Sequence, residues 1–143
     1  MKVSTENALK IMDQMHTAKT LEEGFKDVAE DVLSYDWTKV GVVKGKEALL
    51  EEIIRPSDQA FRNEHFAFNH IVVSEETGIV TVDAVFSADF LGDYKGIPAH
   101  GKRVSWRIRD MHLIENNIIT CMWFASDTLE MLQSMEALDF KFP

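Results

Sequence analysis

The spacing of apolar residues predicts two helices at the start of the chain. Residues 4–19 begin with Ser and Thr, which favour helix N-caps, and apolar side chains then recur at helical spacing. Thr20 and Glu23 form a T-x-x-E capping box, which is typical of the start of a helix. We therefore predict a second helix, whose apolar stripe consists of Leu21, Phe25, Val28, Ala29 and Val32.

The pattern changes its period in the middle of the chain. Residues 46–55 favour a third helix, which Pro56 ends or bends. Residues 65–73 have the composition of a strand. Residues 79–90 alternate between apolar and polar side chains, which is typical of a strand with one buried face. That face carries Val80, Val82, Ala84, Phe86, Ala88 and Phe90.

The last third of the chain predicts a hairpin and a closing helix. Residues 91–102 form a loop rich in Gly and Pro. Two apolar-rich strands follow within 104–124, joined by a polar turn at 116–117. Asp127 is expected to cap a final helix over 128–138.

This order of elements predicts an α+β fold, because helices come first, a run of antiparallel strands follows and one helix closes the chain. The helices would then pack on one face of a curved sheet. The length of 143 residues suits one domain, and no repeat or linker interrupts it. We therefore interpret residues 1–143 as a single domain.

Charge and composition narrow the partners and the compartment. The formal net charge of −9 opposes binding to nucleic acid or anionic membranes and favours small molecules or copies of the chain. No apolar run is long enough to predict a transmembrane helix. The N-terminal segment lacks the apolar core of a secretion signal, and Cys121 is the single cysteine, so a cytoplasmic location is expected.

Asp110 is the sharpest candidate for chemistry. It falls on the strand face that also carries Trp106, Ile108 and Ile114. A carboxyl group in an apolar setting resists ionisation, so it could serve as an acid, a base near neutral pH or a neutral hydrogen-bond donor. The structural alternative is an ion pair with Arg107, Arg109 or Lys102, or a place near the sheet edge.

Two further residues are candidates beside Asp110. His112 shares its face because residues two apart on a strand do so, and the two form either an acid–base couple or a structural hydrogen bond. Asp36 lies between two aromatic residues where a helix is expected to give way to a turn. This position suits either the rim of a pocket or an ordinary turn aspartate.

Other common sites leave no signature. The remaining histidines are scattered without H-x-x-x-H or H-x-H spacing, so no metal site is predicted. No Gly-rich phosphate loop and no G-x-S-x-G motif is present, and no cofactor is expected. Cys121 is interpreted as a buried apolar residue.

The register of the final hairpin decides which residues surround Asp110. If Asn116 and Asn117 form a two-residue turn, Asp110 lies opposite Trp123. If the turn takes three residues, Asp110 lies opposite Met122, and Phe124 joins its face.

The segment "YKGIPAHGKRVSWRIRDMHLIENNIITCMWFASDTLEMLQSM" resembles the SnoaL-like polyketide cyclase family. That family has a "GIPPTGK" loop, an "IDIFRIENGKI"-type turn, a strand written "VEHWD" and a closing "DTLGLLQQLG" helix. These correspond here to "GIPAHGK", "RDMHLIENNI", "TCMWF" and "DTLEMLQSM". The earlier segment "DVLSYDWTKVGVVKGKEALLEEI" is similar to the family's helix end, turn and "G-x-E-A" helix, so the resemblance covers most of the chain.

The resemblance implies a fold like that of nuclear transport factor 2. This is a cone in which a curved antiparallel sheet wraps around N-terminal helices and encloses a pocket, with a C-terminal helix and often a dimer through the sheet. In the family, the positions of Asp110 and Phe124 both line the cavity. Similar folds with ketosteroid isomerase activity carry a base where Asp36 falls and an oxyanion-binding aspartate where Asp110 falls.

The sequence departs from the family at polar positions. Phe124 replaces the acid–base aspartate of the cyclases, and Met122 replaces the histidine two residues before it. Phe90 stands where a histidine often precedes the "GIP" motif, and Met12 falls near the helix tyrosine of the isomerases. Each change removes a polar group, so the aldol-cyclase mechanism does not simply transfer.

These patterns support two hypotheses. The first is a cofactor-free enzyme for isomerisation, cyclisation or dehydration of a small apolar carbonyl or ring compound, in which Asp36 moves a proton, Asp110 steadies an enolate and His112 orients Asp110. The second is a protein of the same fold that binds such a molecule without reacting. In both, the expected ligand-contacting residues are Tyr35, Trp37, Phe86, Phe90, Trp106, Met122 and Phe124.

Overall fold

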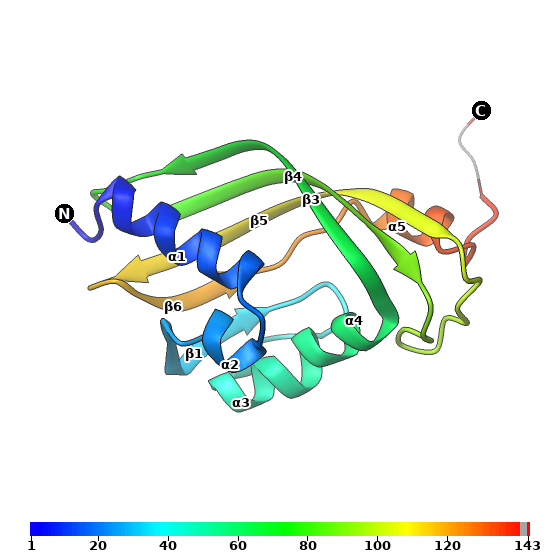
Figure 1. Cartoon of the computed structure of the whole chain (residues 1–143), viewed down its shortest axis with the longest axis horizontal. Helices are drawn as coiled ribbons and strands as arrows, with labels where there is room; N and C mark the ends of the chain where they lie inside the picture. Colours follow the sequence, from blue (N-terminus) through cyan, green and yellow to red (C-terminus); the bar gives the residue numbers. More distant parts are fainter. Residues whose placement is uncertain (141–142) are drawn as a thin grey trace.

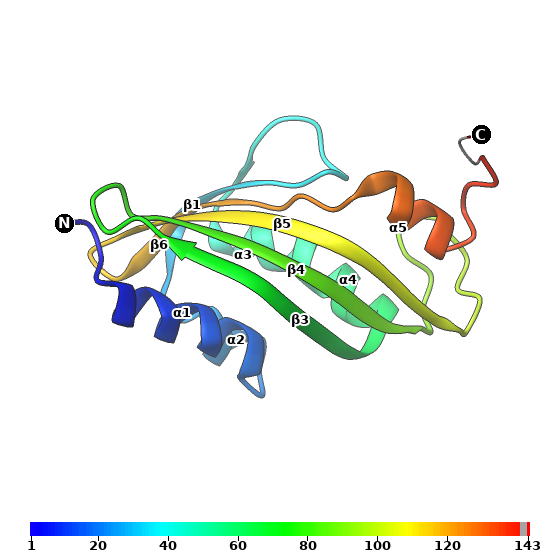
Figure 2. The same cartoon turned by 90° about the horizontal axis from the view of Figure 1, so that it is seen from above.

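The computed structural model describes residues 1–140 and 143, and it shows a curved six-stranded sheet with helices packed against it (Figures 1 and 2). The strands follow the order β2-β1-β6-β5-β4-β3. Residues of the helices line one cavity together with residues of the concave face of the sheet. Among the described residues, no helix is long and apolar enough to cross a membrane.

Long antiparallel strands form most of the sheet. They are β3 (Phe61–Val73), β4 (Ile79–Phe90), β5 (Arg103–Glu115) and β6 (Ile118–Trp123). β4 has the bounds predicted for it, and its predicted apolar face is buried from Val80 to Phe90. This agreement follows from the strict period-two alternation of its sequence.

The second predicted helix was wrong beyond its first turn. The capping box is present, because Thr20 Oγ1 accepts a hydrogen bond from the backbone N–H of Glu23 at 3.2 Å, but α2 covers only Leu21–Gly24. Val28–Tyr35 forms strand β1, which pairs in parallel with β6. The β-branched residues Val28 and Val32 of the predicted stripe suit a strand, and backbone pairing with β6 outweighs the helical spacing.

The predicted antiparallel sheet is present except at one pair, because β1 runs parallel to β6. The short strand β2 (Val43–Lys44) completes this edge of the sheet by pairing antiparallel with β1. β1 therefore carries Tyr35 to the end of β6, and the chain enters the Asp36 turn directly from the sheet.

The third helix runs longer than predicted. α3 (Lys46–Leu49) continues through one π-helical turn, Leu50–Ile54, into α4 (Arg55–Ala60). Pro56 lies in the first turn of α4, directly after the π-helical turn, so its missing N–H falls at the junction of the two segments. The wider turn before it thus lets the helix pass the proline and bring α4 over the cavity.

The other two helices are close to the prediction. α1 (Thr5–Thr17) is capped by Ser4, whose hydroxyl accepts from the backbone N–H of Asn7, and it buries Ala8, Ile11 and Met12. α5 (Thr128–Ser134) is capped by Asp127 as expected, but it ends before 138. Glu136 has a φ of 58°, which stops the helix.

The final hairpin follows neither predicted register. Asn116 and Asn117 form the two-residue turn, with φ of 52° and 64°, and Glu115 pairs with Ile118. A bulge then adds a residue to β6, so Leu113 pairs with Cys121 and His112 with Met122. The shift places Phe124 on the same face as Asp110, and the two line the cavity together.

Candidate active site

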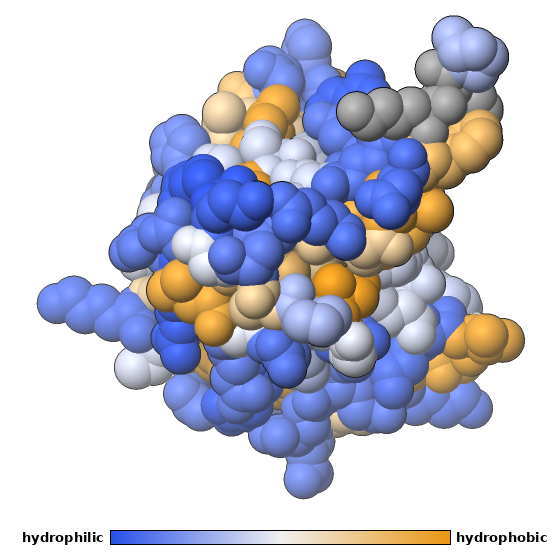
Figure 3. Space-filling model, turned by 90° about the vertical axis from the view of Figure 1, so that its right-hand side faces the viewer, coloured by the Kyte–Doolittle hydropathy of each residue, from blue (hydrophilic) through white to orange (hydrophobic). Residues whose placement is uncertain are grey.

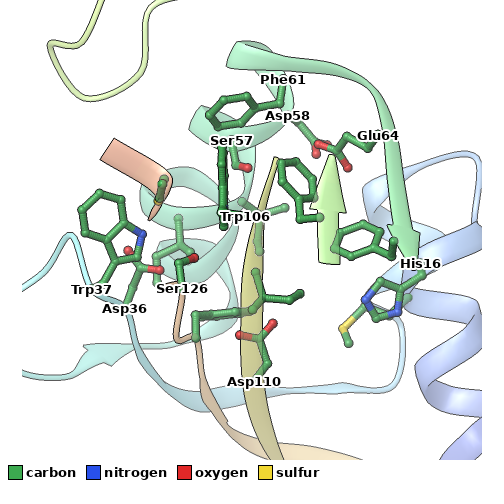
Figure 4. A pocket seen from close by; sticks show the side chains of 18 of the residues that line it. His16, Asp36, Trp37, Ser57, Asp58, Phe61, Glu64, Trp106, Asp110 and Ser126 are labelled. Carbon is green, nitrogen blue, oxygen red and sulfur yellow. The ribbon is translucent and has the colours of Figure 1, made fainter. Parts of the chain in front are cut away.

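A cavity of about 220 Å³ lies between the helices and the concave face of the sheet (Figure 4). α1, α2, α4 and α5 each contribute residues to it, as do β3, β4 and β5. Its apolar wall is largely aromatic and includes Phe25, Trp37, Phe61, Phe66, Phe86, Trp106 and Phe124. Its polar groups are His16, Asp36, Ser57, Asp58, Glu64, Tyr94, Asp110, His112 and Ser126.

Asp110 projects from β5 into this cavity. Its Oδ1 accepts a hydrogen bond from the backbone N–H of Ala125 at 3.0 Å. Burial raises the pKa of Asp110 to about 7, and the charge of Asp36 adds to the rise, while the Ala125 hydrogen bond opposes it. Asp110 is therefore poised to exchange a proton near neutral pH, as a general acid or base must.

The structural alternative for Asp110, an ion pair with a nearby cation, was wrong. Arg107 pairs with Asp127 at 2.7 Å and Glu130 at 3.0 Å, and Arg109 pairs with Asp83 at 3.2 Å. Lys102 pairs with Glu136. Arg107 and Arg109 alternate with Asp110 along β5 and lie on its outer face. No described cation neutralises the Asp110 carboxyl group.

Asp36 lies directly after β1 and also lines the cavity. Its Oδ2 accepts hydrogen bonds from the backbone N–H of Thr38, at 3.0 Å, and from the Thr38 hydroxyl. This side-chain turn fixes one carboxylate oxygen. No described residue hydrogen-bonds the other oxygen, Oδ1, which leaves it available to a ligand.

Tyr94 joins the two aspartates from the loop between β4 and β5. Burial raises the pKa of its phenol, and the charge of Asp36 raises it further. The hydroxyl group is therefore held in its neutral form, which can donate a hydrogen bond. Tyr94 is buried among rings, with its centroid 5.2 Å from that of Phe61 and 6.4 Å from that of Trp37.

His112 does not orient Asp110 as we had predicted. No hydrogen bond joins the two side chains, and the Ala125 backbone orients Asp110 instead. His112 is 2% exposed, and its Nδ1 is buried without a hydrogen-bond partner among the described residues. Burial lowers its pKa to about 3, and the neighbouring His16 lowers it further, so the ring is neutral at physiological pH.

His16 reaches the same cavity from α1. Its Nδ1 lies 2.7 Å from the Met12 carbonyl oxygen, and its ring packs edge-on against Phe66 and Phe68. Burial lowers the pKa of His16, although the Met12 carbonyl opposes this effect. The cavity thus holds two neutral imidazoles whose ring nitrogens can donate or accept one hydrogen bond each.

Four of the seven predicted ligand-contacting residues line the cavity, namely Trp37, Phe86, Trp106 and Phe124. Met122 is fully buried beside His112 but does not reach the cavity. Phe90 is also fully buried, packed against Phe61 and His100. Tyr35 points to the outer face, where it stacks on Trp123 with the rings 6.1 Å apart.

Sequence reasoning missed His16, Asp58, Glu64 and Tyr94. His16 follows Met12 by four residues on the apolar stripe of α1, so its helical position was a usable signal. Asp58 lies beyond Pro56, where the helix was expected to end. Glu64 enters the cavity through a β-bulge, which the sequence pattern does not display.

A second hollow lies on the side of α5 and the loop 91–102. Figure 3 views the side on which α5 and the loop 91–102 lie, and its hydrophobic residues form patches separated by hydrophilic ones. This shallower hollow is lined by residues such as Ile97, His100 and Met135. Within the described part of the chain, no group of three His, Cys, Asp or Glu residues is arranged to hold a metal ion.

A curved sheet that closes with helices around an aromatic, acid-lined cavity defines a cone-shaped, pocket-forming α+β protein. The chain belongs to the SnoaL-like polyketide cyclase family, whose model matches residues 6–135. No curated protein matches the chain.

Solved structures confirm the fold, which is that of nuclear transport factor 2-like proteins. A candidate SnoaL-like polyketide cyclase from Jannaschia sp. CCS1 has a TM-score of 0.82 at 13% identity and covers 96% of this chain and 99% of its own. AclR, a candidate hydroxylase from Streptomyces galilaeus, has a TM-score of 0.80 at 17% identity, and the match covers 97% of this chain and 87% of AclR. IdmH, a candidate polyketide cyclase from Streptomyces antibioticus, has a TM-score of 0.70 at 16% identity, and the match covers 92% of this chain and 97% of IdmH.

Proposed function

We propose that this protein is a cofactor-free enzyme that isomerises, cyclises or dehydrates a small, largely apolar carbonyl or ring compound by acid–base chemistry. The observation that carries the proposal is the placement of two carboxyl groups, Asp36 and Asp110, in one aromatic cavity with no described cation paired to either. Membership of the SnoaL-like polyketide cyclase family supports this class of reaction.

Asp36 is the proposed base. Its free Oδ1 would take a proton from the carbon next to a substrate carbonyl, and the electrons of the C–H bond would form an enolate. The hydrogen bonds from Thr38 to Oδ2 keep the carboxylate in one orientation during this step. The same carboxyl group then returns the proton to a different carbon of the substrate, which completes an isomerisation without net gain or loss of atoms.

Asp110 and Tyr94 are the proposed stabilisers of the enolate oxygen. The pKa of Asp110 is raised to about 7, so a substantial share of it is protonated near neutral pH and can donate a hydrogen bond. The neutral Tyr94 phenol provides a second donor in the same cavity. Donors fixed before the reaction stabilise a developing oxyanion more than water does.

His112 is proposed to contact the substrate directly. Its neutral ring lies beside Phe124, with the ring centroids 6.3 Å apart, and no described side chain hydrogen-bonds it. In this arrangement it would fix the orientation of a polar substrate atom. Asp36 and Asp110 would carry out the proton transfers.

The alternative function, ligand binding without reaction, is supported by Phe124. This residue lines the cavity with an aromatic ring where the cyclases keep their catalytic aspartate. Such a cavity would hold an apolar molecule with the carboxyl groups as hydrogen-bond partners. The same apolar wall also serves the enzyme, which must exclude water from its enolate.

Turnover separates the two functions. Native mass spectrometry and denaturing extraction identify any ligand that the purified protein retains. A panel of carbonyl compounds built on the scaffold of that ligand is then tested as substrates. Conversion by wild type, with a loss of about 100-fold or more in kcat for Asp36→Asn, supports the enzyme. Conversion that is equally fast in Asp36→Asn and Asp110→Asn would show that these residues do not carry the chemistry.

The assembly is proposed to be a homodimer through the outer face of the sheet. An outer patch of Leu33, Tyr35, Met111 and Trp123 spans three neighbouring strands there, and Leu33 and Tyr35 are 39% and 38% exposed. The apolar character of this patch supports an isologous interface, in which the same surface of each copy meets its counterpart.

A further inference from the structure

A second pair of carboxyl groups lies at the mouth of the cavity. Asp58 comes from α4 and Glu64 from β3, and their carboxyl groups point toward one another (Figure 4). Asp58 is half-buried, whereas Glu64 remains exposed to solvent on one side. Neither side chain has a hydrogen bond or an ion pair with any described residue.

The backbone of β3 is bent so that Glu64 enters the cavity. Arg62 pairs with Asp89 and His65 with Ser87, which leaves one extra residue in β3. Asn63 occupies the bulge with a φ of 52°, a conformation that asparagine tolerates better than most residues. Phe61 lines the cavity, and without the bulge its face would continue through residues 63 and 65, so Glu64 would point outward.

Hydrogen bonds hold this bulge in place from outside. Asn63 Nδ2 donates to Asp89 Oδ2 at 2.8 Å, and Arg103 donates to the Asn63 carbonyl oxygen at 2.8 Å. The fold therefore maintains an uncommon backbone conformation whose result is a carboxyl group directed at another carboxyl group. The proximity is unfavourable on its own, since burial and the charge of Asp58 raise the pKa of Glu64 to about 7.

The rest of the cavity lining offers no positive charge to offset these carboxyl groups. No described Lys or Arg lines it, and burial lowers the pKa of both His16 and His112. Arg62 lowers the pKa of both Glu64 and Asp58, and Arg55 lowers that of Asp58, but neither arginine is part of the lining. Four carboxyl groups thus line an aromatic cavity to which no described Lys or Arg contributes.

His112 is another residue of the lining with an unpaired polar atom. The side chain is 2% exposed and lines the cavity, yet its Nδ1 has no partner among the described residues. A buried polar atom without a partner costs roughly 1–3 kcal/mol, which a bound ligand can recover.

We propose that the ligand of this cavity carries a protonated amine, which binds between Asp58 and Glu64 while its apolar body lies along the aromatic wall toward Asp110. This inference rests on the proposed function only in that a small molecule occupies this cavity. The rings of Phe61 and Phe66 line the same cavity as the carboxyl pair, and aromatic faces attract cations. Charge-assisted hydrogen bonds to two carboxylates would add to that attraction.

An amine fits this mouth better than a metal ion does. Calcium takes about six to eight oxygen ligands, and magnesium demands an octahedral set. The described residues contain no group of three His, Cys, Asp or Glu arranged around such a point. Two carboxyl groups beside aromatic rings instead match the size and hydrogen-bonding capacity of an ammonium group.

The test compares three probes that share one ring and differ in charge. Tryptamine is cationic, tryptophol is its neutral analogue and indole-3-acetate is anionic, and each is titrated into wild-type protein by calorimetry. We expect tryptamine to bind about tenfold more tightly than tryptophol, and indole-3-acetate to bind most weakly. Glu64→Gln and Asp58→Asn should each reduce the preference for tryptamine, and the double variant should abolish it.

A matched control is Glu76→Gln, which makes the same charge change in the exposed turn between β3 and β4. It should leave the preference unchanged. Equal binding of tryptamine and tryptophol overturns the proposal, as does a preference that survives in the double variant. Failure of all three probes to bind at millimolar concentration also overturns it, because the shared indole ring matches the aromatic wall.

The experiment keeps this inference separate from the proposed catalysis. Asp110→Asn should retain the preference for tryptamine while it loses turnover. If the amine preference is absent but Asp110→Asn still abolishes conversion of a neutral substrate, only the amine proposal fails. If the preference is present and neither aspartate of the catalytic pair affects conversion, only the catalytic proposal fails.

Discussion

The Asp110 carboxyl group accepts a hydrogen bond from the backbone N–H of Ala125 at 3.0 Å, and this is its single hydrogen bond to a described residue. The bond spans the point where β5 passes the end of β6, and Arg109 N–H donates to the Ala125 carbonyl oxygen at 2.8 Å beside it. Asp110 is thus held firmly in position but is poorly compensated in charge. Such an arrangement favours function over stability.

Asp110→Asn should stabilise the protein at alkaline pH. Burial raises the pKa of Asp110 to about 7, above its value in the unfolded chain, so ionisation of this group destabilises the fold as pH rises from about 4 to 7. The amide stays neutral and retains an oxygen that can accept from Ala125. We expect a gain on the order of 2 kcal/mol in the free energy of unfolding at about pH 8, and little change near pH 4.

Urea denaturation at the two pH values measures this difference. Asp93→Asn is a suitable control because Asp93 lies on the exposed loop and accepts a hydrogen bond only from the Ala99 backbone. A variant that is less stable than wild type at pH 8 would show that the Asp110 charge is compensated in the fold.

His112→Gln should stabilise the protein at acidic pH, which is the opposite of the pH dependence expected for Asp110→Asn. The pKa of His112 is lowered to about 3 by burial, below its unfolded value of about 6.5. Protons therefore bind the unfolded chain preferentially, and this group reduces stability as pH falls from about 6.5 to 3. Removing it should stabilise the protein most at the acidic end of that window.

The two variants are best compared by the difference between each variant and wild type in the free energy of unfolding, measured across a range of pH. The stabilisation by Asp110→Asn should grow with rising pH, whereas that by His112→Gln should shrink, each with a limiting slope of about 1.4 kcal/mol per pH unit. Titrating groups that do not interact with the replaced residue, such as Glu64, cancel in these differences. Two difference profiles with the same sign of slope would contradict the environments described for these side chains.

The inward direction of Asp110 and the bounds of β4 were accessible from the sequence, since both depend on a period of two within a single strand. The resemblance also placed Phe124 on the same face as Asp110, and both residues line the cavity. The register of the hairpin was not accessible, because it depends on a bulge in β6, and a bulge adds one residue without altering local composition. The same holds for the bulge at Asn63 that turns Glu64 inward.

Strand β1 shows a different reason for failure. The spacing of Val28 and Val32 fits a helix as well as a strand, and nothing local distinguishes the two. The choice depends on β6, which lies about 90 residues away in the sequence and supplies the parallel partner. Because β1 leads into the Asp36 turn, this long-range pairing also sets the position of one half of the proposed catalytic pair.

Phe124→Asp should introduce the aspartate that the cyclases carry at this position, at a cost in stability. The side chain lines the cavity on the same face as Asp110, so a fifth carboxyl group would enter an already acidic space. Burial and repulsion should raise the pKa of the new aspartate and raise that of Asp110 further. We expect destabilisation of about 2 kcal/mol at about pH 8 and less at pH 5, where the new group is protonated.

Phe124→Leu separates the charge from the loss of the ring. It removes aromatic contacts with His112, whose centroid lies 6.3 Å away, without adding a carboxyl group. Its destabilisation should be independent of pH. If Phe124→Asp and Phe124→Leu lose the same stability at every pH, the cavity does not disfavour another negative charge at this position.

Trp123→Arg should convert the proposed homodimer into a monomer. Trp123 lies at the end of β6, stacked on Tyr35 at an interplanar angle of 5°, and the two rings occupy the outer patch. The arginine would bring two like charges together if the patch meets its own copy across a two-fold axis, and desolvating them is costly. Light scattering after size-exclusion chromatography, over a range of protein concentrations, measures the mass directly.

Val40→Arg places the same charge on the exposed loop between β1 and β2 and should leave the dimer intact. A wild-type protein that is monomeric throughout, or a Trp123→Arg variant that remains dimeric, would exclude this interface.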